Sequence, residues 1–434
     1  MNVRVRRPTR LGGEVRVAGD KSITHRAILL AAMAEGRSRI SGYLDGTDCR
    51  ASIGCMRALG ATIEADGNDL IVEGRALAEW AEPTAPLDCI RSGTTMRLLA
   101  GLLAGRPWFS VLTSDPQLSR RPMGRVVEPL RAMGARIDGR DEGRYPPLAI
   151  RGGALHGIHY DLPVASAQVK SSLLLAGLSA QGATTLSEPG LSRDHTERML
   201  VARGVPLKTE GHCHTLHGPV AAIPPQDVRV PGDFSSAAFV IGAGLLAAND
   251  TVIIRDVGLN CTRTGLLDAI AAMGASVRCA NVREEGGEPV GDLIVEAQPL
   301  KGAMIPAALV PRMIDEFPVL ALLATQAEGE TVITGAEELR VKETDRIAAL
   351  AGQLVRLGAQ VEERLDGFVI SGPTPLVGAE VDCGGDHRLA MTLAVAGLVA
   401  EGETLVAGAR CVVDSFPGFD RVMEELAPAA MRWQ

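Results

Sequence analysis

A helix-opening pattern that returns along the chain constrains its fold more than any other feature. Each copy sets small or polar residues directly before a long apolar run, and the copies start roughly 70 residues apart. They start at Gly19, Ser92, Ser166, Gly232, Asp315 and Gly385. This spacing predicts that the chain is built from six copies of one unit.

A second signal has the same period. Five stretches with helical character end in glycine and pass into alternating apolar and polar residues, at Gly60, Gly134, Gly204, Gly274 and Gly358. Glycine just past a helix end is a stop signal, and the alternation predicts a strand. We therefore expect an α/β fold in which each unit holds two helices and several short strands.

The six units are expected to form two similar domains. A chain of 434 residues favours two domains over one. Residues 1–18 alternate apolar and polar around Val3, Val5, Val15 and Val17 as an edge strand pair does, and the Val-Arg-Val motif at 15–17 returns at 228–230. We predict one domain from residues 1–19 plus 232–434, another from residues 20–231, and a hinge near 19–20 and 231–232.

Composition argues against several classes of protein. Aromatic residues make up 3% of the chain and the net charge is -8, so neither stacking rings nor a positive field favours nucleic acid. No apolar run is long enough to span a bilayer, and no leader peptide is recognisable. The eight cysteines form no CxxC pair, which indicates a reduced, cytoplasmic protein.

The first helix start predicts an anion site. Gly19 and Asp20 are typical of a turn and an N-cap. Lys21, Ser22 and Arg26 then bring two cations to the positive end of a helix dipole, which suits a phosphate. The alternative is a capped helix with a solvated basic first turn.

Other helix starts carry cations as well. If two domains face one another, these starts gather Lys21, Arg26, Arg97, Arg121, Arg193, Lys342, Arg346 and Arg388. Because arginine binds phosphate and carboxylate through two parallel hydrogen bonds, the set predicts substrates with several anionic groups. Asp315 and Glu343 are the carboxylates nearest to this set and can act as general acid and base.

One histidine-rich segment raises the question of a metal. His212, His214 and His217 flank Cys213, and two of the histidines share one face of a strand. The spacing fits no usual zinc pattern, so we expect an exposed polar strand and no metal.

Six segments resemble those of the EPSP synthase family. They are residues 19–26 (GDKSITHR), 92–97 (SGTTMR), 121–124 (RPMG), 166–171 (SAQVKS), 340–346 (RVKETDR) and 386–391 (DHRLAM). The resemblance runs from Val15 to Phe419 and implies two similar domains, each of three βαβαββ-type units in an inside-out α/β barrel. It implies transfer of the enolpyruvyl group of phosphoenolpyruvate to the 5-hydroxyl of shikimate 3-phosphate, with release of phosphate. It also implies a monomer of the shikimate pathway that needs no metal or organic cofactor.

The resemblance further implies a role for particular residues. Shikimate 3-phosphate is expected to contact Lys21, Ser22, Arg26, Ser166, Gln168, Arg193, Asp315 and Lys342. Phosphoenolpyruvate is expected to contact Lys21, Gly93, Arg121, Gln168, Arg346 and Arg388. Asp315 would act on the hydroxyl proton, and Glu343 with Lys21 would protonate the methylene carbon. Gly93 would leave room for the inhibitor glyphosate.

Three positions depart from the family pattern. Arg91 stands in place of an asparagine, Ala167 in place of a serine found in some members, and Asp414 in place of a lysine found in some. One alternative is a UDP-N-acetylglucosamine enolpyruvyl transferase, although Ser22 follows Lys21 here and residues 114–121 hold no cysteine. The other is a non-catalytic anion-binding paralogue.

Overall fold

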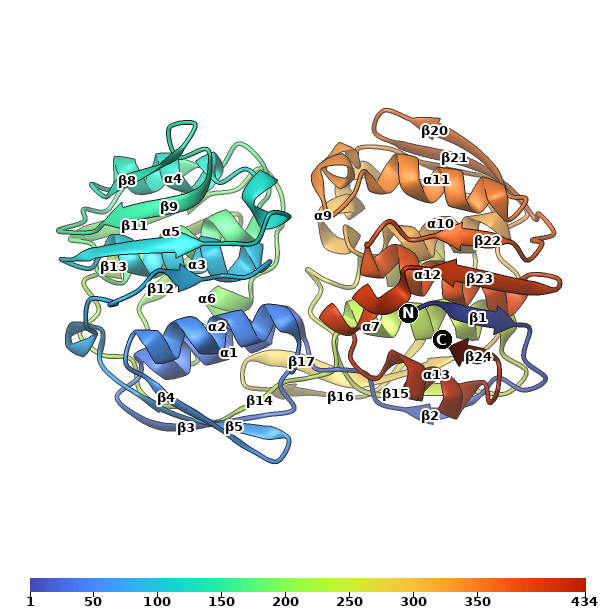
Figure 1. Cartoon of the computed structure of the whole chain (residues 1–434), viewed down its shortest axis with the longest axis horizontal. Coiled ribbons are helices and arrows are strands. Elements are labelled where there is room, and N and C mark those ends of the chain that lie inside the picture. Colours follow the sequence, from blue (N-terminus) through green and yellow to red (C-terminus); the bar gives the residue numbers. More distant parts are fainter. The chain divides into compact units, whose positions relative to one another are not determined.

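The computed structural model describes residues 1–434 as two compact units (Figure 1). Unit 1 consists of Met1–Ala18, Pro231–Glu284 and Pro289–Gln434, and unit 2 of Gly19–Val230 and Glu285–Glu288. The hinge expected near 19–20 and 231–232 stays a prediction, because compactness of the two units shows no movement between them.

Unit 2 contains three copies of one pattern of helices and strands. Its helices are α1 (Lys21–Met33), α2 (Thr47–Ala58), α3 (Gly93–Ala104), α4 (Gly124–Ala132), α5 (Ala167–Gly177) and α6 (His195–Val201). Its strands are β3 (Gly36–Ser41), β4 (Thr62–Asp66), β5 (Asp69–Gly74), β6 (Leu87–Asp88), β7 (Phe109–Thr113), β8 (Arg136–Arg140), β9 (Tyr145–Arg151), β10 (His159–Asp161), β11 (Gly182–Ser187), β12 (Leu207–Glu210), β13 (Cys213–Gly218) and β14 (Val228–Arg229).

Unit 1 repeats this pattern three times. Its helices are α7 (Phe234–Ala247), α8 (Gly265–Ala272), α9 (Val310–Met313), α10 (Phe317–Thr325), α11 (Arg346–Arg356), α12 (His387–Val399) and α13 (Phe419–Leu426). Its sheets use β1 (Val3–Arg6), β2 (Gly13–Val15), β15 (Val252–Gly258), β16 (Arg278–Glu285), β17 (Glu288–Val295), β18 (Met304–Ile305), β19 (Gly329–Ile333), β20 (Gln360–Arg364), β21 (Gly367–Gly372), β22 (Glu380–Asp382), β23 (Glu403–Ala407) and β24 (Met431–Trp433).

All six sheets have four strands and one topology. The orders are β14-β3-β5-β4, β6-β7-β9-β8, β10-β11-β13-β12, β2-β15-β17-β16, β18-β19-β21-β20 and β22-β23-β1-β24. In each sheet the first strand runs parallel to the second, and the second runs antiparallel to the third. The mixed sheets and paired helices confirm the two-domain α/β fold.

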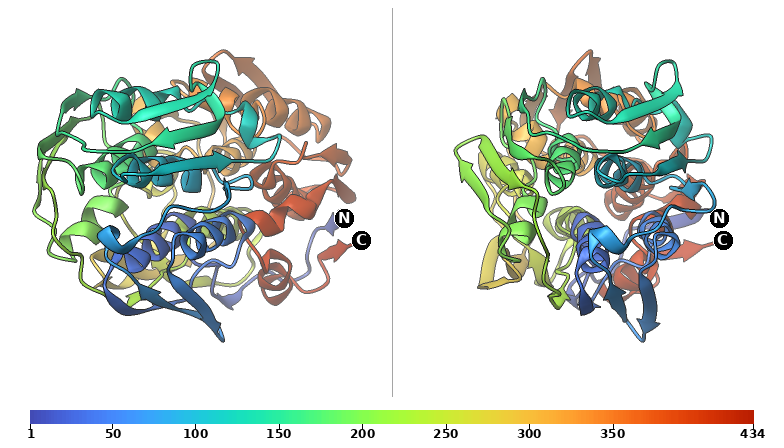
Figure 2. Two further views of the ribbon diagram at one scale, coloured as in Figure 1. Left: turned by 60° about the vertical axis from the view of Figure 1, so that its left-hand side comes forward. Right: turned by 90° about the vertical axis from the view of Figure 1, so that its left-hand side faces the viewer.

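The first helix of every copy lies inside its unit. In α1, every residue from Ile23 to Met33 is buried, and α3 and α12 are each buried except at one residue. A helix that is apolar on all sides is stable only in such a core. In both views of Figure 2 the sheets of unit 2 lie outside these helices, as expected for an inside-out barrel.

Glycine allows two of these inner helices to touch. A Cβ atom added at Gly101 of α3 would lie 2.0 Å from the Ser172 carbonyl oxygen of α5. At the helix ends, Gly60 and Gly134 adopt φ of 108° and 109°, which confirms the predicted glycine stop signals. The N-cap predicted at Asp20 is also confirmed, because its side chain accepts the Ile23 N–H over 2.8 Å.

The edge strand pair expected in residues 1–18 is wrong as a pair, because β1 and β2 belong to different sheets. Strand β1 pairs with β23 on one side and β24 on the other, so it lies inside its sheet, whereas β2 does lie at the edge of its own sheet. Val17 lies outside both strands. The partners of β1 come from the far end of the chain, which local alternation does not reveal.

No helix combines the length and apolar character needed to cross a membrane.

Candidate active site

In unit 2, the start of α1 presents a paired lysine. Lys21 is the first residue of α1, and its Nζ lies 3.1 Å from Oδ2 of Asp48 in α2. Both side chains are partly exposed. Ser22 follows at the second helical position and is also partly exposed. This helix start therefore offers an ammonium and a hydroxyl to an anion at the positive end of the helix dipole.

Arg26 lies one turn further along α1 and is buried. Its Nε donates to Thr196 Oγ1 over 2.6 Å, its Nη2 to Ser171 Oγ over 2.8 Å and its Nη1 to the Ser22 carbonyl over 3.0 Å. Burial lowers the pKa of the Arg26 guanidinium to about 10, and Glu197 opposes this shift. The group is therefore charged at neutral pH and held in place by neutral partners.

A second cluster of cations lies at the start of α3. A Cβ atom added at Gly93 would lie 3.1 Å from Arg97 Nη1 and 3.5 Å from Arg121 Nη1. Arg97 also donates to Gln168 Oε1, while Gln168 Nε2 donates to Thr94 Oγ1 over 2.9 Å. Two guanidinium groups thus lie beside Gly93, the first residue of α3, which has no side chain.

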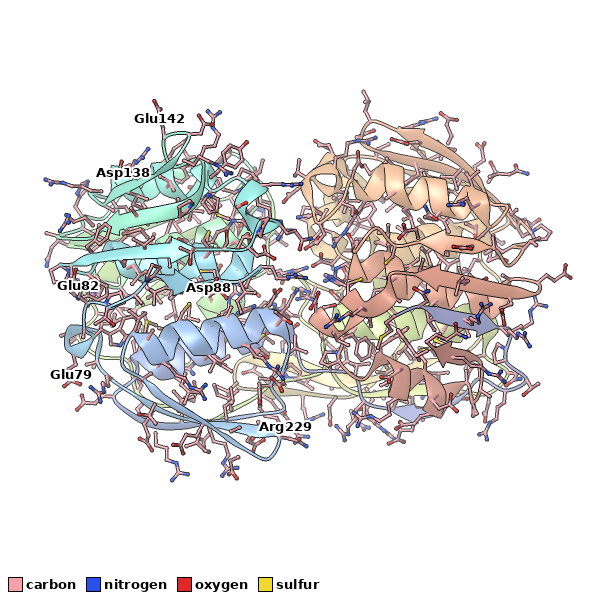
Figure 3. The ribbon with its side chains drawn as sticks, viewed as in Figure 1. Glu79, Glu82, Asp88, Asp138, Glu142 and Arg229 are labelled. Carbon is pink, nitrogen blue, oxygen red and sulfur yellow. The ribbon has the colours of Figure 1, made fainter.

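The remaining candidates of unit 2 lie at neighbouring helix starts. Ser166 is the N-cap residue of α5 but makes no capping hydrogen bond with its side chain. Arg193 is partly exposed in the loop before α6, and its charge acts on Arg26. Glu79, Glu82, Asp138 and Glu142, which Figure 3 labels, lie along the outer rim of unit 2 and are no part of these clusters.

In unit 1, Arg346 joins the candidate residues into one network. Its Nε donates to Asp386 Oδ2 over 2.7 Å and its Nη2 to Glu343 Oε2 over 2.6 Å. Its Nη1 lies 3.5 Å from Asp315 Oδ1, and the Nε of Arg388 lies 3.3 Å from the same oxygen. Helix starts of α10, α11 and α12 supply these residues, which explains how distant segments meet.

The pKa values in this network depend on burial and on the neighbouring charges. Burial alone would lower the pKa of Arg346, but Asp386, Glu343 and Asp315 outweigh burial and raise it. Burial lowers the pKa of the Lys342 ammonium, against the attraction of Glu338 at 2.9 Å and of Asp315. The cluster therefore places two carboxylates, Asp315 and Glu343, among held cations.

Two partners were missed by sequence reasoning. Asp386 is fully buried, binds Arg346 and also accepts the Arg388 N–H over 2.9 Å as N-cap of α12. Its place directly before a helix start could have identified the cap, but not the contact with Arg346. Asp48 is the partner of Lys21, and only the packing of α2 on α1 reveals it.

The histidine-rich segment proves to be structural. His214 is buried in β13, with Nε2 3.1 Å from Glu188 Oε1, whereas His212 and His217 are exposed. Lys170 Nζ contacts the same Glu188 oxygen at 2.6 Å. The expectation of an exposed polar strand is therefore wrong for His214, which belongs to a buried ion network. No group of three or more metal-ligating residues is present.

The structure shows where the three positions that depart from the family pattern lie. Arg91 is exposed, and its Nε lies 3.3 Å from Asp115 Oδ2. Asp414 is partly exposed at the end of the 3-10 helix η5 (Ala409–Asp414). Ala167 is the first residue of α5.

Comparison with known proteins places the chain beside one enzyme family. The family model of EPSP synthase (3-phosphoshikimate 1-carboxyvinyltransferase) matches residues 5–423. A curated 3-phosphoshikimate 1-carboxyvinyltransferase of Brevibacillus brevis is 48% identical over 98% of this chain and 100% of that protein. That of Gloeobacter violaceus is 54% identical over 94% of this chain and 95% of that protein.

Solved structures agree with this comparison. The EPSP synthase of Acinetobacter baumannii has a TM-score of 0.90 and 40% identity, and the match covers 100% of this chain and 99% of that one. The enolpyruvyl transferase NikO of Streptomyces tendae has a TM-score of 0.81 at 22% identity, which shows a shared fold alone.

Proposed function

This chain belongs to the EPSP synthase family, and we propose how its residues carry out the reaction of that family. It is a transferase that moves the carboxyvinyl group of phosphoenolpyruvate to the 5-hydroxyl of shikimate 3-phosphate and releases phosphate. The observation that carries the proposed mechanism is the contact of Arg346 with both Asp315 and Glu343. An addition across a double bond requires one group that gives a proton and one that takes a proton. Asp315 and Glu343 are two such groups, and both contact Arg346.

We propose that shikimate 3-phosphate is bound by residues of both units. From unit 2 it uses Lys21, Ser22, Arg26, Ser166, Gln168 and Arg193, and from unit 1 it uses Asp315 and Lys342. The grouping of Lys21, Ser22 and Arg26 at one helix start supports a phosphate there. Buried Arg26 gains from a bound anion, because burial disfavours its unpaired charge.

Phosphoenolpyruvate is proposed to use a partly overlapping set. Lys21, Gly93, Arg121 and Gln168 come from unit 2, and Arg346 and Arg388 from unit 1. Gly93 beside the Arg121 guanidinium supports this placement, since a bare helix start lets a small anion approach both. Arginines fix a carboxylate or phosphate in plane, which orients the reacting double bond.

The proposed reaction has an addition step and an elimination step. Glu343, with Lys21, gives a proton to the methylene carbon, while Asp315 takes the proton of the attacking 5-hydroxyl. The oxygen bonds to the neighbouring carbon and gives a tetrahedral intermediate. The Glu343 carboxylate then takes a proton back from the methyl group, the C–O bond to phosphate breaks, and the new enol ether forms. The arginines stabilise charge on the departing phosphate.

We infer that the enzyme works as a monomer in the cytoplasm. Its cysteines are all free thiols, as is usual in a reducing compartment. Sedimentation of the purified protein at micromolar concentration tests the monomer, and a dimer mass would contradict it.

Phosphate release tests the proposed function. The purified protein should release phosphate from phosphoenolpyruvate when shikimate 3-phosphate is present. UDP-N-acetylglucosamine should not replace the shikimate ester. Release with the nucleotide sugar alone would favour the other enolpyruvyl transferase, and no release with either would favour a non-catalytic paralogue.

Lys21→Ala should abolish turnover, because it removes a cation proposed to touch both substrates and to assist protonation. The matched control is Lys208→Ala, which removes an exposed lysine paired with Glu210 in β12. The control should keep the rate of the unaltered enzyme. Turnover near that rate in Lys21→Ala, with an unchanged circular dichroism spectrum, would refute the role.

A further inference from the structure

Two thiols of unit 1 lie in contact beside the proposed site. The sulfur atoms of Cys383 and Cys411 are 3.9 Å apart. Cys383 directly follows β22, and Cys411 lies in η5, which follows β23. Because β22 and β23 are parallel neighbours, with Asp382 opposite Ala407, both cysteines leave the sheet at the same edge. The sheet itself therefore holds the two thiols together.

We propose that Cys383 and Cys411 form a thiol-oxidation site, at which hydrogen peroxide converts the two thiols into one disulfide. One of the two sulfurs takes one oxygen atom from the peroxide and becomes a sulfenic acid, and water is released. The other sulfur then attacks the sulfur of the sulfenic acid. The S–S bond forms, and the hydroxyl leaves with the proton of the attacking thiol as a second water. Two thiols and one peroxide thus give one disulfide and two waters.

The surroundings of the two thiols favour a reaction between them. Cys411 is partly exposed and gives the oxidant access to the pair, whereas Cys383 is buried. The contact between the two sulfurs lowers the pKa of the Cys383 thiol and raises that of the Cys411 thiol, so Cys383 supplies the thiolate, which is the reactive form. A disulfide needs the sulfur atoms about 2 Å apart, so closing the gap takes rotation of both side chains with a small backbone shift.

The other close thiols of the chain lack this arrangement. Cys55 and Cys89 act on one another in unit 2, but both are buried. Cys261 and Cys279 are exposed. Accessibility and a neighbouring thiol therefore coincide at Cys411.

A disulfide here would disturb the arginine network. The Cys383 carbonyl accepts the Asp386 N–H over 3.0 Å, and the Asp386 carboxylate holds Arg346 Nε at 2.7 Å. Movement of Cys383 toward Cys411 therefore pulls on the turn that positions Arg346 and Arg388. We expect weaker binding of phosphoenolpyruvate in the oxidised enzyme. This consequence rests on the proposed function, whereas the disulfide does not.

Peptide mapping tests the site directly. The full chain is treated with hydrogen peroxide, its remaining thiols are alkylated, and the digest is analysed by mass spectrometry. We expect a Cys383 peptide joined to a Cys411 peptide, lost after dithiothreitol. Its absence, with Cys411 recovered as sulfinic acid or as free thiol, would overturn the proposal. This readout needs no activity, so it decides the site even if the proposed reaction is wrong.

Kinetics tests the link to the arginines. Oxidation should raise the KM for phosphoenolpyruvate severalfold, leave that for shikimate 3-phosphate nearly unchanged, and be reversed by dithiothreitol. Cys411→Ser should resist this change, whereas the control Cys279→Ser should respond like the unaltered enzyme. An unchanged KM in protein shown to carry the disulfide would refute the coupling through Asp386, and a response that persists in Cys411→Ser would refute the site.

Discussion

Gly93 starts α3, and a side chain there would point at two cations of the proposed site. Gly93→Ala should raise the inhibition constant of glyphosate at least about tenfold, because one extra carbon in a fitted site costs ~1–3 kcal/mol. The added Cβ would lie 3.1 Å from Arg97 Nη1 and 3.5 Å from Arg121 Nη1. Inhibition assays at fixed phosphoenolpyruvate measure the change.

The matched control is Gly54→Ala in α2, where an added Cβ meets nothing within 4 Å. Its inhibition by glyphosate should equal that of the unaltered enzyme. Equal inhibition of Gly93→Ala and the control would remove the argument that space at Gly93 admits the inhibitor.

Glu188 gives a prediction for acid stability. Burial would raise the pKa of this carboxyl, but hydrogen bonds from His214, Lys170 and Ser192 outweigh burial and lower the pKa to about 2 from the ordinary 4.5. Ionised Glu188 therefore stabilises the fold above pH 4.5, by about 3 kcal/mol, and this contribution is lost as pH falls toward 2.

The unfolding midpoint should accordingly depend less on pH in Glu188→Gln across that acid window than in the unaltered enzyme. The variant should also be less stable at neutral pH, since Lys170 loses one of its two carboxylate partners. Parallel pH profiles of the two proteins, measured by thermal denaturation, would contradict the assignment.

At the scale of the element, the N-cap of α11 positions the start of the helix that carries Arg346. Asp345 accepts the Ala348 N–H over 3.1 Å and so caps α11, whose first residue is Arg346. Asp345→Ala should lower the free energy of unfolding by ~1 kcal/mol, because the cap is lost. Asp345→Ser keeps a capping oxygen and should recover most of this stability in denaturant titrations. Equal losses in both variants would show that the cap contributes little.

The same elements show which features were readable in advance. The cap at Asp20 and the stop at Gly60 depend on residues within one turn, so local sequence predicts them. The inner position of β1 and the burial of His214 were not predictable in this way. Both depend on partners far along the chain, which only the folded structure brings together.

At the scale of the whole molecule, six equivalent helix starts are divided between two units, and candidate residues lie at helix starts of each unit. The resemblance to the EPSP synthase family implied a substrate contact or a proton-transfer role for each candidate residue. The structure adds the partners that hold each cation, such as Asp48 for Lys21 and Asp386 for Arg346. These partners were missed because hydrogen bonding between helices leaves no periodic signal in the sequence.

The central claim is that the proposed residues bind shikimate 3-phosphate, and calorimetric titration of this substrate tests it most directly. Arg193→Ala and Lys342→Ala each remove one proposed contact. We predict that each variant weakens binding at least about tenfold, the value of one charge-assisted hydrogen bond. Unchanged affinity in either variant, with the fold intact, would contradict the proposed contact of that residue with the substrate.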